Sequence, residues 1–154
     1  ADRGKVVWVQ ARQLAWRGHA GTLDWLQPAY DNGYKVVTMK EFGSRGLAHG
    51  VGPTRTVIGD GPVYICFDLD CLDPTIAAGV SNIEPGEKGF DIDEAVGLLH
   101  AVRGLNIVGG DIVCMMPTKD NPNQITALTA MAVMFEMISM VAENVAGGAA
   151  KNGT

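Results

Sequence analysis

Two aspartates stand two residues apart where an apolar run of the sequence ends. Asp68 and Asp70 directly follow the run 63–67 (VYICF). Residues i and i+2 of an extended chain project to the same side, so Asp68 and Asp70 would present their carboxylates together. Two like charges at the edge of a core are costly without a cation, and divalent ions such as manganese or magnesium suit carboxylate ligands. The spacing alone is equally compatible with aspartates that cap a turn and face water.

The elements around this pair alternate between short apolar runs and helical patterns. Strands are predicted at residues 6–9, 34–38, 63–67 and 105–113, and helices at 22–32, 91–103 and from about 123 onward. Gly33 and Gly104 end the first two helices, and Asp91 with Glu94 has the spacing of a capping box. The glycines at positions 43, 46, 50 and 52 predict a glycine-rich connection. The alternating order predicts an α/β fold of three α-β-α layers around a mainly parallel sheet.

A long loop follows the third strand, from Cys71 to Gly89. Loops of this length within a compact domain are usually functional. In open α/β sheets, binding sites form outside the carboxyl ends of the strands. Both arguments place the candidate site at Asp68 and Asp70.

Composition narrows the class of partner and the compartment. The chain has 154 residues, a formal net charge of −5 and no basic block, which argues against nucleic acid or a membrane surface as partner. The three cysteines have no CxxC spacing, which predicts free thiols in a reducing compartment. The polar start predicts no signal peptide, and the apolar segment 125–141 contains polar residues and predicts a buried helix rather than a membrane span. Cytoplasmic location is expected.

Several segments in the same order resemble the ureohydrolase family of arginases, agmatinases and their relatives. The matching segments are FDLDCLDP at 67–74, AG at 78–79, EPG at 84–86, GLNIVGGD at 104–111 and ITAL at 125–128. The resemblance is strong over about residues 62–142 and looser over 9–37, and it favours the agmatinase-like branch. It implies an arginase-like fold.

The resemblance also implies a chemistry and roles for single residues. Asp68 and Asp70 match aspartates that bind two divalent ions in the family, with manganese expected here and nickel as the alternative. The ions share a bridging hydroxide, which attacks the guanidinium carbon of a small guanidino substrate and yields urea and an amine. Asp73 and Asp111 match supporting residues, although Asp73 could equally serve only to form the turn before Pro74.

Other parts of the family pattern are missing from the sequence. Relatives take further metal ligands from a Gly-Gly-Asp-His segment and an Asp-x-His-x-Asp segment, and neither occurs here. Two aspartates cannot hold two ions, so residues 1–154 are expected to form the C-terminal part of one ureohydrolase domain whose N-terminal half is absent. The alternative is that a separate chain completes the site. His19, in the loop after the first strand, would either contact substrate or be an ordinary loop histidine.

Cys114 is the departure that bears on specificity. Relatives place a glutamate at this position, where it pairs with the substrate guanidinium, and a thiol cannot form that bidentate pair. Its loss should cost roughly 2 to 4 kcal/mol of cation binding unless another group, such as Glu84, substitutes. The change argues against arginine or agmatine itself as the substrate and favours a smaller or alkylated guanidine or a biguanide. The expected substrate classes are therefore an agmatine-like compound, a free or alkylated guanidine, or a biguanide. A catalytic role for Cys114 is the remaining alternative.

These observations lead to two functional hypotheses. The first is a binuclear amidinohydrolase that acts on linear amidines, with this chain alone incomplete. The second is a non-catalytic ureohydrolase-like subunit that stabilises an active partner. By resemblance a homo-oligomer, trimer or hexamer, is expected in the first case, and a hetero-oligomer is the alternative.

Overall fold

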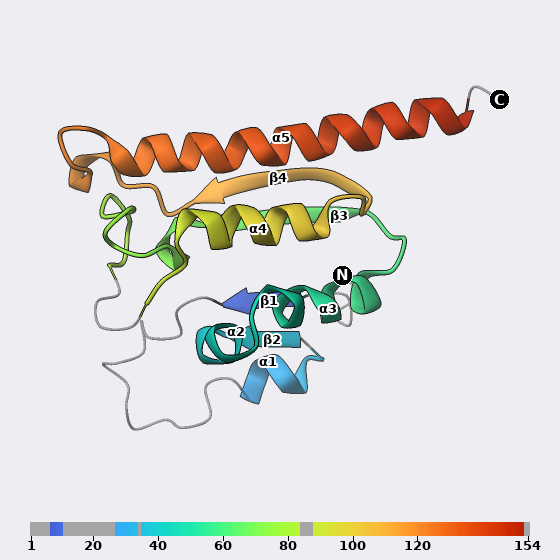
Figure 1. Ribbon diagram of the computed structural model, residues 1–154, viewed down its shortest axis with the longest axis horizontal. Helices are drawn as coiled ribbons and strands as arrows, with labels where there is room; N and C mark the ends of the chain where they lie inside the picture. Colours follow the sequence, from blue (N-terminus) through green and yellow to red (C-terminus); the bar gives the residue numbers. More distant parts are fainter. Residues whose placement is uncertain (1–6, 11–26, 34, 84–87, 153–154) are drawn as a thin grey trace.

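The computed structural model describes residues 7–10, 27–33, 35–83 and 88–152 (Figure 1). In chain order the strands and helices are β1 (Val7–Gln10), α1 (Gln27–Asp31), β2 (Lys35–Thr38), α2 (Met39–Arg45), α3 (Leu47–Ile58), β3 (Val63–Asp68), α4 (Ile92–Val102), β4 (Ile107–Val113) and α5 (Ile125–Asn152). The four strands therefore lie at the four predicted positions. Short 3₁₀ turns at Leu69–Cys71 and Pro117–Lys119 follow β3 and β4.

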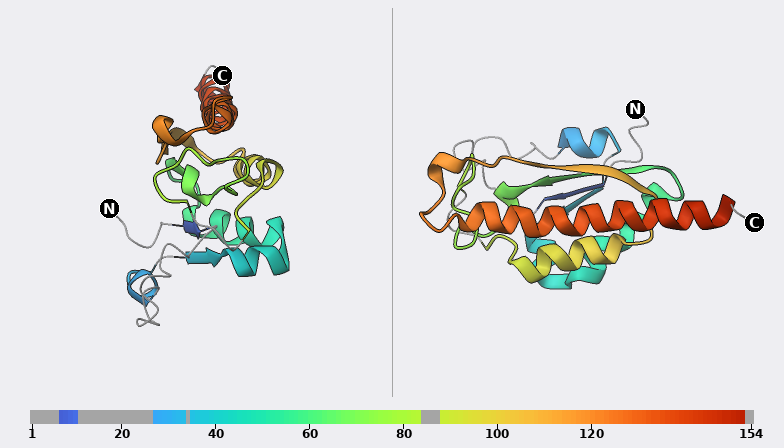
Figure 2. Two further views of the ribbon diagram at one scale, coloured as in Figure 1. Left: turned by 90° about the vertical axis from the view of Figure 1, so that its left-hand side faces the viewer. Right: turned by 90° about the horizontal axis from the view of Figure 1, so that it is seen from above.

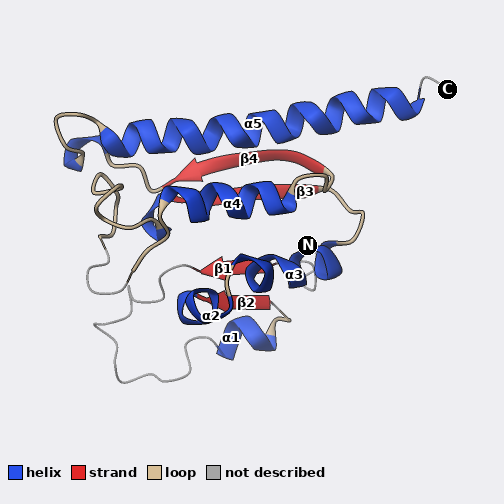
Figure 3. Ribbon diagram, in the orientation of Figure 1, coloured by secondary structure: helices blue, strands red, loops and turns tan. Residues whose placement is uncertain are grey.

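Strand pairing is parallel throughout the described part of the chain. β1 pairs with β2 from Val7↔Lys35 to Gln10↔Thr38, and β3 pairs with β4 from Val63↔Ile107 to Asp68↔Val113. The α/β class is therefore as predicted. The single sheet expected from the sequence is instead present as two strand pairs, with no hydrogen-bonded ladder between them in the described residues (Figure 3).

One hydrophobic core joins the β3–β4 pair to α4 and α5. Buried side chains from all four elements form it, namely Val63, Leu99, Ile107, Val133, Met137 and Met140. Gly110 lets α5 lie close to β4, because a Cβ at this position would collide with Met137 and with the Ile65 carbonyl. This packing fixes the ends of β3 and β4 relative to the start of α5.

A second core connects the β1–β2 half to the loop that follows β3. Val37 and Phe42 pack with Leu69 and Phe90, and the two phenylalanine rings meet edge to face at 4.8 Å. Ala95 from α4 completes the contact. The two strand pairs thus belong to one packed structure although their ladders are separate.

The predicted glycine-rich connection is wrong, because that segment forms α2 and α3. Thr38 caps α2 in a capping box with Glu41, with the Glu41 N–H donating to Thr38 Oγ1 at 3.1 Å. Gly46, at φ +74°, separates the two helices. A glycine inside a helix costs only about 1 kcal/mol. The cap and the burial of Phe42 and Val51 oppose that cost.

The predicted boundaries of α4 are confirmed. The Glu94 N–H donates to the Asp91 carboxylate at 2.8 Å, and the Asp91 N–H donates to the Glu94 carboxylate at 3.0 Å. Arg103 caps the other end, and Gly104 follows in the left-handed region at φ +86°. The spacing of the capping box was sufficient to locate this helix.

The last helix, α5, is buried on one side only. Figure 2 shows it as a long element at the edge of the structure. Its outward side exposes large apolar side chains, namely Leu128, Met131, Phe135, Ile138 and Val145. The prediction of a buried helix is therefore correct for the side against β4 and wrong for the opposite side. By length and composition Ile125–Gly147 could also cross a membrane, a property that core helices share.

Candidate functional site

The carboxyl ends of β3 and β4 bring the candidate residues together. Asp68 is the last residue of β3 and pairs in register with Val113, the last residue of β4. Asp70 follows in the 3₁₀ turn, and Cys114 follows β4 directly. This is the edge of the sheet that the sequence predicted for the site.

The route by which Asp70 reaches the site differs from the prediction. Asp70 is not on an extended strand, because the chain turns at Leu69, whose side chain is completely buried. The Asp68 carboxylate caps this turn by accepting the Asp70 N–H at 2.9 Å. Asp68 therefore both caps the turn and lies close to Asp70, although a cap and a shared metal site were alternative predictions from the sequence.

Asp68, Asp70 and Cys114 form a group with the composition of a metal site. One ligand atom from each, two carboxylate oxygens and the Cys114 sulfur, all lie within 4.8 Å of one another. Asp68 is exposed and the other two are half-buried, so solvent reaches the group. This donor set fits one divalent ion whose remaining positions are filled by water. A second ion would need ligands beyond these three.

A short antiparallel contact holds the loop after β3 against Cys114. The Ser81 N–H donates to the Cys114 carbonyl at 3.0 Å, and the Met116 N–H donates to the Gly79 carbonyl at 2.8 Å. Val80 and Met115 pair between these two bonds. Segments 79–81 and 114–116 are thus fixed side by side.

That contact supplies Asp70 with its hydrogen-bond partners. The Ser81 hydroxyl lies 3.0 Å from one Asp70 oxygen, the Asn82 side-chain amide donates to the same oxygen at 3.2 Å, and the Asn82 N–H donates to the other at 3.3 Å. These donors orient the carboxylate and leave lone pairs for a cation. These bonds were not predicted from the sequence, because they accompany the pairing of segments more than thirty residues apart.

Hydrogen bonds at the start of α5 hold the same loop in place. The Gly79 N–H donates at 2.9 Å to the hydroxyl of Thr126, a residue with no exposed surface. The Asp120 carboxylate caps the helix by accepting the N–H groups of Thr126 at 3.2 Å and Ala127 at 3.0 Å. Desolvation of the carboxylate raises the pKa of Asp120, but the hydrogen bonds together have the larger effect and lower this pKa below its ordinary value.

Cys114 has an unusual backbone and a poorly acidic thiol. Its φ of +67° lies in the left-handed region, which is uncommon for a residue with a side chain. Burial, together with the neighbouring carboxylates of Asp68 and Asp70, raises the pKa of the thiol to about 11. Without a cation the group is therefore a thiol rather than a thiolate at neutral pH. This argues against Cys114 as a free nucleophile.

The two supporting aspartates lie in different surroundings. Asp73 accepts the Thr75 N–H at 3.0 Å and the Gly89 N–H at 3.3 Å, so it forms the turn and ties the two ends of the loop together. Asp111 lies beside Cys66 on the neighbouring strand, where a hydrogen bond with Asp111 raises the pKa of the Cys66 thiol. Their supporting roles in catalysis stay predictions.

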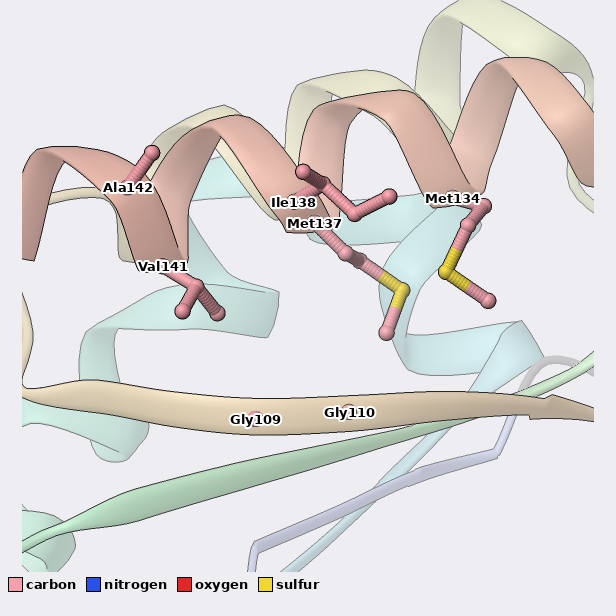
Figure 4. Close-up of a pocket in the computed structure, with 7 residues that line it drawn as sticks. All are labelled: Gly109, Gly110, Met134, Met137, Ile138, Val141 and Ala142. Atoms are coloured by element: carbon pink, nitrogen blue, oxygen red, sulfur yellow. The ribbon is translucent and has the colours of Figure 1, made fainter.

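The other two predicted substrate contacts, His19 and Glu84, fall outside the described residues. A separate apolar pocket of about 340 Å³ lies between β4 and α5 (Figure 4). It is lined by Gly109, Gly110, Met134, Met137, Ile138, Val141 and Ala142. None of these side chains is charged, so this pocket lacks the groups that would bind a guanidinium ion.

Comparison with known proteins supports the same family over most of the chain. Residues 8–139 match the model of the arginase family. The chain is 38% identical over 108 residues to agmatinases of Enterobacter sp. (strain 638) and Escherichia coli O7:K1, an alignment that covers 70% of this chain and 34% of each agmatinase. The aligned part of the chain therefore spans about a third of the length of these relatives.

Solved structures show the same fold. Proclavaminate amidino hydrolase from Streptomyces clavuligerus superimposes with a TM-score of 0.76 at 30% identity, over 93% of this chain and 44% of that one. An agmatinase from Burkholderia thailandensis, described as hypothetical, gives a TM-score of 0.75 at 26% identity, over 95% and 42% respectively. The arginase-like fold is thereby confirmed, and the chain belongs to the arginase family.

Proposed function

We propose that this chain contributes the β3–β4 side of a metal-dependent hydrolase that converts a guanidino compound to urea and an amine. The observation that carries this proposal is the group formed by Asp68, Asp70 and Cys114 at the carboxyl ends of β3 and β4. The family assignment supports it. A divalent ion held there lowers the pKa of water and so makes a nucleophile available near neutral pH.

In this proposal the two aspartates of the group bind the cation, and two neighbouring residues orient one of them. Asp68 and Asp70 hold the cation, and the donors Ser81 and Asn82 fix the orientation of the Asp70 carboxylate. An aspartate fixed by such donors binds a cation with less loss of side-chain freedom. The exposed side of Asp68 leaves the group open to a small substrate and to water.

We further propose that residues outside these 154 complete the site, either from the same polypeptide or from a partner chain. The family relatives are longer, since the alignment covers 34% of each agmatinase. The exposed apolar side of α5 supports the same proposal, because contiguous large apolar side chains on a surface usually mark an interaction site. In the described residues the two strand pairs share no hydrogen-bonded ladder, which is also consistent with an additional strand or helix beside them.

The substrate side chain is proposed to differ from that of arginine. Cys114 cannot supply the carboxylate that would pair with a guanidinium ion, so a compound whose binding depends less on that pair is favoured. Agmatine-like compounds, free or alkylated guanidines and biguanides meet this requirement. An oligomer, trimeric or hexameric, and a cytoplasmic location are part of the same proposal.

Release of urea tests the function. The complete protein, loaded with divalent metal, should release urea from at least one guanidino compound, and Asp68→Ala and Asp70→Ala should each abolish it. Asp60→Ala is the matched control, because this aspartate lies exposed in the turn after α3. Full activity in either site variant would exclude these aspartates as essential residues. Absence of urea from every guanidino compound would favour the non-catalytic subunit.

A further inference from the structure

The sulfur of Cys114 is the one soft donor in the group. It lies within 4.8 Å of ligand oxygens of both Asp68 and Asp70. Two ligands of the same tetrahedral ion, at about 2.0 Å for oxygen and 2.3 Å for sulfur, are separated by about 3.5 Å. Movements of roughly 1 Å would therefore bring all three donors onto one ion.

The backbone already holds Cys114 in a fixed position. The β4 ladder ends at Val113 directly before Cys114, and hydrogen bonds from the Ser81 N–H to the Cys114 carbonyl and from the Met116 N–H to the Gly79 carbonyl hold the chain after it. Between the ladder and this contact, Cys114 has a left-handed φ of +67°. Such a conformation is unfavourable for a residue with a side chain, and it persists where the surroundings determine it. The ladder and this contact thus direct this side chain, rather than a neighbouring one, at the two aspartates.

We propose that Cys114 is a metal ligand together with Asp68 and Asp70, and that the site consequently selects a thiophilic divalent ion such as zinc, cobalt or cadmium over manganese. This inference rests on the metal site of the proposed function and deepens it by naming the class of ion. It departs from the expectation of manganese drawn from the sequence. Soft thiolate ligands favour such ions, whereas oxygen ligands suit manganese and magnesium.

Binding involves an acid–base step on sulfur. The S–H bond of Cys114 breaks, the proton passes to solvent or buffer, and the sulfur lone pair forms the bond to the ion. No electron transfer accompanies the step. The two carboxylates already balance the charge of a divalent ion, and the coordinated thiolate adds one negative charge, so the group then carries a net charge of −1. That remaining negative charge favours a cationic substrate.

Cobalt(II) titration with optical detection tests the inference independently of turnover. On addition of cobalt(II), the complete parent protein should develop the near-ultraviolet absorption of thiolate-to-cobalt charge transfer. This absorption should stop increasing at a stoichiometric ratio of cobalt to protein. Cys114→Ser should lose this band, and its affinity for cadmium should fall at least about tenfold, since even outer partners of a ligand change affinity 10- to 100-fold. Cys66→Ser is the matched control and should keep the band, because Cys66, on β3, is not among the three side chains whose ligand atoms meet at the site.

The outcomes separate this inference from the proposed function. Cobalt that binds to the parent and is lost in Asp70→Asn, but without a charge-transfer band, overturns the role of Cys114 and leaves the carboxylate site intact. A charge-transfer band that persists in Cys114→Ser likewise overturns the role of Cys114. No cobalt binding by the parent overturns the metal site itself and this inference with it. Cys114→Glu provides a second test, because it should remove the band and shift the preference toward manganese.

Discussion

Thr126 links the start of α5 to the loop that carries the partners of Asp70, so Thr126→Val should weaken both the fold and the site. The Thr126 hydroxyl accepts the Gly79 N–H at 2.9 Å and is completely buried. Valine has nearly the same shape but leaves that N–H without a partner. A buried donor that loses its partner costs about 1 to 3 kcal/mol.

For a chain of this size, 1 kcal/mol corresponds to roughly 2–4 °C in the melting temperature. Thr126→Val should therefore melt about 2 to 12 °C below the parent. Thr126→Ser keeps the hydroxyl and loses one methyl group, so its free energy of unfolding should fall by only about 1 kcal/mol. Chemical denaturation of the three proteins measures these differences directly.

Cobalt affinity provides the second readout for the same variant. The Val variant should bind cobalt more weakly than the Ser variant, because loosening Gly79 also loosens Ser81 and Asn82 beside Asp70. A Val variant within about 0.5 kcal/mol of the parent, the ordinary range for a surface change, would refute the claim that this hydrogen bond anchors the loop.

Three further substitutions test the fold, each by its free energy of unfolding. Asp91→Ala should cost about 1 kcal/mol at neutral pH. The hydrogen bond from the Glu94 N–H lowers the pKa of Asp91. The stability that the Asp91 carboxylate contributes is therefore fully present above the ordinary pKa of aspartate and is lost as the pH falls through the lowered pKa. A difference in unfolding free energy between parent and variant that does not shrink in acid would contradict this. Gly43→Ala should stabilise α2 by roughly 0.5–1 kcal/mol, since a Cβ there meets no atom within 4 Å beyond its own neighbours in the helix, and destabilisation would argue against a helix at this position. Gly89→Ala should destabilise by about 1–3 kcal/mol, because its Cβ would lie 2.5 Å from the Asp73 nitrogen; an unchanged free energy would show that the backbone moves aside.

Local signals were sufficient to predict most elements. Apolar runs located the four strands, and the Asp91–Glu94 spacing located α4, because both patterns depend only on neighbouring residues. The same kind of reasoning failed for α2 and α3, because the glycines at 43, 46, 50 and 52 predicted a connection and the capping-box spacing of Thr38 and Glu41 was overlooked. Only Gly46 interrupts the helical path there.

Non-local contacts explain why only part of the site could be predicted. The sequence identified Asp68 and Asp70 from their position after an apolar strand, and it singled out Cys114 by comparison with the family pattern. It could not place the Cys114 sulfur beside the two carboxylates, because that depends on the parallel register that pairs Asp68 with Val113, the residue before Cys114. The hydrogen bonds of Ser81 and Asn82 to Asp70 accompany a second non-local contact, the antiparallel pairing of Val80 with Met115.

Metal content per chain, measured by elemental analysis on protein purified without chelators, tests the central claim most directly. The complete protein should retain a stoichiometric divalent ion, and Asp68→Ala and Asp70→Ala should each lose it while Asp60→Ala keeps it. Retention of the full amount of metal in both site variants would contradict the account, because the ion would then be held elsewhere in the molecule.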